Sequence, residues 1–219
     1  SAQNSSYTRL FEDPGGENQV VLFKSCFPNS ALEGTPDDSP DPEGWLTVGH
    51  AKYVYNEILH YFSTRPDKLF VVITAPPLTD STYAENARAF NLWLVNDWLL
   101  ENKYTVPNIA VFDFYNVLTD REAHHRFFEG DIEHVIRASN ILAYPTSDDH
   151  PSQKGSQKAT EEFIPLLNIF VNRWLSTTSV IPVDSLPVIE TTSPEDGGSL
   201  PSGSEGVSPP TRKLIPCLS

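Results

Sequence analysis

Asp148 and His150 are the two residues of this chain whose types and spacing best suit acid–base chemistry. They lie in the segment 147–152, directly before a long amphipathic stretch. A histidine in this position can take a proton from a nucleophile, and the carboxylate can fix the histidine tautomer and stabilise the imidazolium that forms. The alternative is a solvated surface loop that contains a histidine. The choice depends on whether the rest of the chain supplies catalytic partners.

The composition favours one acidic globular domain. The chain has 219 residues, 39% of them hydrophobic, with a formal net charge of −14. This length and apolar content are enough to build a core. An acidic surface repels phosphate backbones and anionic lipids, so we expect no nucleic-acid partner. The chain lacks an apolar run of about eighteen residues, so we expect no membrane span. We also expect no cofactor and no metal.

The elements that must position these residues are strands and helices that alternate along the chain. Short continuous apolar runs suit strands buried on both faces, and they occur at 20–23, 69–74 and 109–112. Apolar residues at helical spacing predict helices over 48–63, 84–101 and 153–175. This alternation favours βαβ units around a parallel sheet. The predicted fold is α/β, a three-layer flavodoxin-like sheet flanked by helices.

Both ends differ in composition from the middle of the chain. Residues 1–18 are polar and are predicted to form an irregular lead-in, and 19–175 form the predicted domain. Residues 176–219 are rich in Pro, Ser, Thr and Gly, and cannot bury enough apolar surface to offset their ordering entropy. We expect an extended tail that suits self-association or O-glycosylation. Asn4 begins an N-glycosylation sequon.

The order of these segments resembles the SGNH (GDSL-like) hydrolase superfamily over roughly residues 17–175. Asp148 and His150 match its final block, although the usual Asp-x-x-His spacing would put the acid at Ser147. Residues 70–77 resemble its strand ending in Thr-x-Pro-Pro, and residues 85–91 and 111–114 resemble the next helix and strand of the family. The resemblance implies acyl transfer by a Ser–His–Asp triad, with His150 as the base and Asp148 as its partner.

Two interpretations of the first strand compete. In one, Ser25 is the nucleophile on the turn before Cys26. In the other, which we prefer, residues 24–30 are the block that carries the oxyanion-hole asparagine, because the segments after residue 30 match those that come after that block in the family. Asn29 would then donate its side-chain amide to the oxyanion, and the nucleophile would lie upstream of Ser1. The chain starts with serine and contains no methionine, so we expect a processed or partial chain.

Further side chains are candidates for contacts with substrate. Trp45 comes after Asn29 in the loop and suits stacking on a sugar, while Lys24 suits either an anionic substrate or a neighbouring carboxylate. Cys26 is expected to be a small buried residue, and its pairing with Cys217 is left open. His124 and His125 suit substrate or metal contacts, but the neighbouring Arg126 and the lack of a spaced Cys or Asp partner favour a solvated loop, in a looser region that also contains His134.

These residues support two functional hypotheses. The first is a secreted hydrolase, extracellular or at the cell surface, that deacylates an ester or an acylated carbohydrate. The second is a non-catalytic extracellular subunit of a filament or cell-surface assembly, which keeps an esterase-like fold and uses its tail to link neighbours.

Overall fold

Three short parallel strands form the central sheet of the computed structural model, which describes residues 18–178. They are β1 (Val20–Lys24), β2 (Leu69–Ile73) and β3 (Ile109–Phe112), hydrogen-bonded in the order β1-β2-β3. Most of their residues are β-branched or aromatic, the types that pack well on a pleated surface. The predicted α/β class with a parallel sheet is therefore confirmed.

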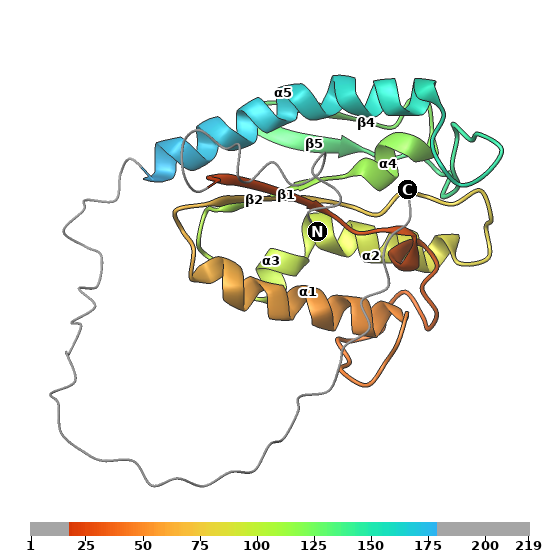
Figure 1. The fold of residues 1–219 in the computed structure, drawn as a ribbon, viewed down its shortest axis with the longest axis horizontal. Helices are drawn as coiled ribbons and strands as arrows, with labels where there is room; N and C mark the ends of the chain where they lie inside the picture. The colour runs from red at the N-terminus through yellow and green to blue at the C-terminus, as the bar shows by residue number, and fades with distance from the viewer. Residues whose placement is uncertain (1–17, 179–219) are drawn as a thin grey trace, which may run out of the picture. The chain divides into compact units, whose positions relative to one another are not determined.

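One face of the sheet is covered by the crossover helices (Figure 1). They are α1 (Val48–Ser63), α2 (Ala84–Asn96) and the one-turn α3 (Trp98–Glu101). The side chain of Thr47 caps α1 by accepting a hydrogen bond from the backbone N–H of His50 at 3.1 Å. The core of this layer is aromatic, because the ring of Tyr55 packs edge-to-face against Phe90 and Trp98.

The opposite face is covered by a long helix and a β-hairpin (Figure 1). The helix is α5 (Gln153–Thr178), which continues through Pro165, and the hairpin joins β4 (His124–Phe128) to β5 (Asp131–Val135). Residues buried between α5 and the sheet include Val71, Phe112, Leu166, Phe170 and Trp174. The described residues therefore form helical layers on both faces of the sheet.

β1 is an edge strand, and the expectation that it is buried on both faces is wrong. Leu22 is 44% exposed, whereas Val71 and Val72 of β2 are fully buried. The reason is position in the sheet: within residues 18–178, β1 has a hydrogen-bonded neighbour on one side only. The apolar run at 20–23 therefore correctly indicates a strand without indicating its place in the sheet.

Other boundaries differ from the predicted ones. The helix expected over 84–101 is interrupted at Asp97, and α5 runs three residues past the expected end at 175. The hydroxyl groups of Ser176 and Thr178 donate to carbonyls one turn earlier in α5. The rest of the expected tail, and the sequon at Asn4, lie outside the described residues.

The region between β3 and the Asp148–His150 segment contains two elements that the apolar periodicity does not predict. The first is α4 (Phe114–Thr119), and the second is the β4–β5 hairpin. The hairpin turns through Glu129 and Gly130, whose φ angles are 50° and 90°. Two consecutive positive φ angles are typical of the type I′ turn, which matches the twist of the flanking strands.

We expect Phe90→Ala to lower the free energy of unfolding by about 3–5 kcal/mol, because it empties a fully buried ring site between Tyr55 and Trp93. Leu100→Ala is the control, since Leu100 is 77% exposed, and should change stability by less than about 0.5 kcal/mol. Urea unfolding followed by far-ultraviolet circular dichroism measures both. Equal stabilities of the two variants would contradict the packing described for this layer.

Candidate functional site

Loops at the carboxyl ends of β1 and β2 and the loop before α5 meet at one rim of the sheet. The Ser30 hydroxyl, after β1, donates to the carbonyl of Pro76, after β2, at 2.5 Å. The backbone N–H and hydroxyl of Thr79 donate to Asp149 Oδ1 at 2.8 and 2.6 Å. These bonds join three segments that are far apart in sequence. Asp149, which has no predicted role, is the residue that fixes the loop before α5 to this rim.

Asp148 and His150 are hydrogen-bonded to each other on that loop. Asp148 Oδ1 lies 3.1 Å from His150 Nδ1 and 2.9 Å from the backbone nitrogen of His150, and it also accepts from the Thr146 hydroxyl at 2.8 Å. The backbone N–H of His150 lowers the pKa of Asp148 most, followed by the Thr146 hydroxyl and the His150 ring. An ionised carboxylate only accepts, so Nδ1 carries the proton and Nε2 is left as the basic atom.

The loop after β1 contacts this pair. The rings of Phe27 and His150 pack edge-to-face with centroids 5.0 Å apart. Phe27 begins the 3₁₀ helix η3 (Phe27–Ser30), which also carries Asn29. Asn29 is half-buried, and its side-chain amide makes no hydrogen bond within residues 18–178. The structure therefore brings the predicted oxyanion-hole segment to the predicted base.

Ser25 points to a different partner. Burial raises the pKa of Tyr55 of α1 to about 12, and the nearby Ser25 side chain partly offsets this effect. His150 makes no hydrogen bond to Ser25. The structure thus joins His150 to Asp148 and to the segment of Asn29, but it does not join His150 to Ser25.

The remaining predicted residues are dispersed. Trp45 is 72% exposed, and its ring lies 6.3 Å from that of His50. Lys24 ends β1, with its Nζ 5.7 Å from the centre of the Phe114 ring. Cys26 is a free, half-buried thiol, and Cys217 lies outside the described residues.

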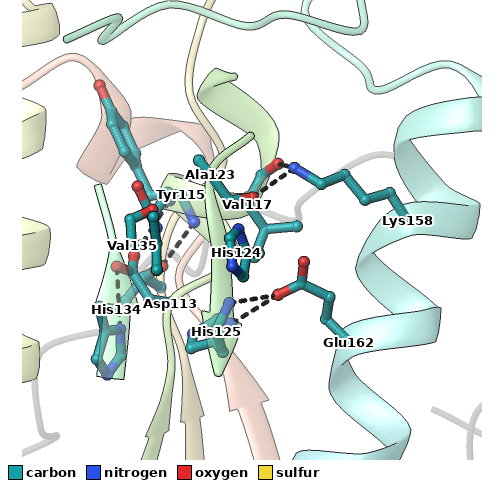
Figure 2. Close-up of polar contacts among 12 residues, drawn as sticks. Asp113, Tyr115, Val117, Ala123, His124, His125, His134, Val135, Lys158 and Glu162 are labelled. Carbon is teal, nitrogen blue, oxygen red and sulfur yellow. Dashed lines mark hydrogen bonds and ion pairs between the residues drawn. The ribbon is translucent and has the colours of Figure 1, made fainter. Parts of the chain in front are cut away.

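His124 and His125 lie in β4 and His134 lies in β5 of the hairpin, so the expectation of a solvated loop at His124 and His125 is wrong (Figure 2). The His125 side chain is only 2% exposed, and Glu162 Oε2 accepts from its Nδ1 at 2.9 Å and from its backbone N–H at 2.8 Å. His134 Nδ1 lies 3.4 Å from Asp113 Oδ2, and the two histidine rings pack edge-to-face with centroids 4.7 Å apart. This row of side chains connects α5, through the hairpin, to the end of β3.

The contacts of His125 and His134 with Glu162 and Asp113 hold the hairpin against α5 and the end of β3. In the same region the Lys158 ammonium donates to the carbonyls of Val117, Asp120 and Ala123 at 2.5–2.7 Å (Figure 2). Burial lowers the pKa of Lys158. Among the described residues, no group of three or more His, Cys, Asp or Glu side chains is arranged to hold a metal ion.

Arg88 of α2 holds the long segment that leads from β5 to the Asp148–His150 pair. Its guanidinium donates to the Ser139 carbonyl at 2.8 Å, to Asn140 Oδ1 at 2.9 Å and to the Thr119 hydroxyl at 2.8 Å. The Tyr115 hydroxyl donates to the Asn140 carbonyl at 2.7 Å. Sequence reasoning missed Arg88 because a single arginine on an amphipathic helix gives no sign that it is buried.

Comparison of the chain with protein-family models found no matching family, and comparisons with curated proteins and with solved structures found no match. Within the part of the chain that the structure describes, no helix combines the length and the apolar character needed to cross a bilayer.

We expect Glu162→Ala to lower the free energy of unfolding by about 1–3 kcal/mol, because it leaves two buried donors of His125 without their acceptor. Glu161→Ala is the matched control, since Glu161 is exposed on the same turn of α5 and, among the described residues, accepts a hydrogen bond only from Gln157. Urea unfolding measures stability, and hydrogen exchange of the His125 amide should quicken only in Glu162→Ala. An unchanged exchange rate of the His125 amide in Glu162→Ala would contradict the hydrogen bond from this amide to Glu162.

We expect Thr146→Val to raise the pKa of Asp148 but to leave it below 3.8, because the bond from the His150 backbone N–H remains. A carboxyl whose pKa is lowered by folding stabilises the folded state above its unfolded pKa, and this contribution is lost as pH falls through the folded pKa. Carbon-detected NMR titration of the Asp148 carboxyl measures the shift. A wild-type pKa at or above 3.8 would contradict the described bonds.

Proposed function

We propose that the protein is an ester hydrolase of the SGNH type, on a flavodoxin-like fold, with His150 as general base and Asp148 as the residue that positions it. The observation that carries the proposal is the hydrogen bond between Asp148 Oδ1 and His150 Nδ1. The His150 ring packs against Phe27 at the rim formed by the carboxyl ends of the parallel strands. Such rims are where sites form in α/β folds. The loop position before the last described helix matches the final block of that superfamily.

In the proposed reaction, His150 Nε2 accepts the proton of a serine hydroxyl as the serine oxygen bonds to the ester carbonyl carbon. Asp148 stabilises the resulting imidazolium. Asn29 donates its free side-chain amide to the oxyanion, an interaction worth about 3–4 kcal/mol of barrier. The imidazolium then protonates the departing alcohol as the ester bond breaks. Water, deprotonated by His150, releases the acid and restores the serine.

The proposed nucleophile is a serine outside the described residues, with Ser25 as the other candidate. The position of Ser25 beside Tyr55 supports the first choice, because it places Ser25 next to a side chain of the helical layer of α1. The edge of β1 that has no strand neighbour within residues 18–178 also supports it. Further strands of an SGNH-type sheet, including the strand before a nucleophile, would add at that edge.

The proposed substrate is an ester or an acylated carbohydrate, and the proposed location is extracellular or at the cell surface. Trp45 supports a carbohydrate, because an aromatic ring that is 72% exposed on a loop can stack on the apolar face of a sugar. A non-catalytic assembly subunit is the second candidate. It is supported by the same edge of β1, which has no strand neighbour among the described residues and can accept a strand from a neighbouring molecule.

We expect the natural polypeptide to hydrolyse p-nitrophenyl acetate, and His150→Ala to lower kcat/KM by about 10²–10⁴-fold through loss of the base. Asn29→Ala should cost about 10²–10³-fold in kcat by removing an oxyanion donor. His60→Ala is the control, since its side chain is 83% exposed on α1. Hydrolysis that is unchanged in His150→Ala would sink the proposal, and an inactive wild-type protein would favour the assembly subunit.

Labelling with a fluorophosphonate and subsequent peptide mapping identifies the nucleophile. We expect the label on a serine outside residues 18–178, with labelling retained in Ser25→Ala and lost in His150→Ala. A label on Ser25 would overturn the preferred choice of nucleophile and leave the hydrolase in place.

A further inference from the structure

A pocket of about 270 Å³ opens between the carboxyl ends of the three strands and the first turns of α5. Its walls are formed by residues of two strands and two helices. Ile73 ends β2, Phe112 ends β3, Phe114 begins α4, and Ala159 and Phe163 lie on α5. Asp148 and His150 are not among its lining residues. The pocket is therefore a site separate from the proposed catalytic pair.

Aromatic rings dominate the apolar wall. The Phe112 ring lies 6.2 Å from that of Phe114 and 5.0 Å from that of Phe163, tilted by 37° and 57°. Rings at these spacings favour a further aromatic ring in an offset or edge-to-face arrangement. The volume is near the lower end of the range for small-molecule pockets, which suits a ligand with a single ring.

The polar side chains that line the pocket are Lys24, Ser156 and Thr160, all of which can donate a hydrogen bond, and the Thr160 hydroxyl already donates to the Ser156 carbonyl at 2.9 Å. Lys24 Nζ lies over the Phe114 ring, and within residues 18–178 Lys24 has no carboxylate partner. The Ser156 hydroxyl makes no hydrogen bond within the described residues. No acidic side chain lines the pocket, although the chain carries a formal charge of −14. An unpaired cation on an acidic protein favours an anionic ligand at this point over the surrounding surface.

We propose that this pocket binds a small aromatic carboxylate. The ring packs among Phe112, Phe114 and Phe163, and the carboxylate pairs with the Lys24 ammonium and accepts from the Ser156 hydroxyl. Lys24 alone would attract any anion, and the rings alone would accept any small apolar molecule. Because Lys24 lies beside the aromatic rings, the pocket favours a ligand that combines an aromatic ring with a negative charge. The inference does not rest on the proposed hydrolase activity.

Isothermal titration calorimetry of the full chain at pH 7 and low salt tests the pocket with benzoate, benzamide and acetate. We expect saturable binding of benzoate, and binding of benzamide and acetate that is weaker by about three- to tenfold, since each lacks one of the two features. Absence of saturable benzoate binding up to about 10 mM would overturn the proposal. Acetate binding as tightly as benzoate would also overturn it, because the rings would then contribute nothing.

Substitution of Lys24 tests the pairing. We expect Lys24→Met to weaken benzoate by about three- to tenfold without changing benzamide, and Lys24→Arg to retain benzoate binding. Lys154→Met is the matched control for net charge, since Lys154 is exposed on the first turn of α5 and outside the pocket lining. Equal effects of the two methionine variants would overturn the pairing. Because Lys24 is exposed at the end of β1, we expect its substitution to leave the fold intact. The urea unfolding midpoints of the variants verify this.

Discussion

The parallel pairing of β2 with both neighbours is the constraint on which the rest of the structure depends. The register aligns Lys24 with Ile73 and Ile73 with Phe112, so all three strands end at one level. The segments after these strands must then leave the sheet at the same rim. Because parallel strands need crossover connections, the same pairing also places α1 and α2 on one face of the sheet. The other face is left for α5 and the hairpin.

The rim is built by two kinds of interaction with different consequences. Buried ones set the positions of whole elements: the Arg88 guanidinium holds the segment around Asn140, and Glu162 holds His125 of the hairpin to α5. The bonds around Asp148 are solvent-exposed, with 55% of the His150 side chain accessible, so they orient a ring without adding much stability. A substrate that covers this surface would strengthen them by excluding water.

The spacing of apolar residues predicted the helices and strands well where one uninterrupted apolar pattern spans one helix or one strand. The helix at 48–63 and the strand at 109–112 have the predicted bounds. Sequence reasoning failed where long-range pairing decides: the edge position of β1, the burial of His125 by Glu162, and the anchoring of Asp149 by Thr79. Each depends on residues distant in sequence, which local patterns do not record. The hairpin has one local signal, Gly130, because glycine adopts the positive φ angle that a tight turn needs.

The central claim is that His150 and Asn29 act on the same substrate carbonyl at this rim. A crystal structure of the natural polypeptide after reaction with a phosphonate ester tests it most directly, because the bound phosphorus marks the position of that carbonyl carbon. We expect the phosphonyl oxygen to accept a hydrogen bond from the Asn29 side-chain amide, with His150 Nε2 facing the serine oxygen bonded to phosphorus. An adduct that Asn29 and His150 do not contact would contradict the claim.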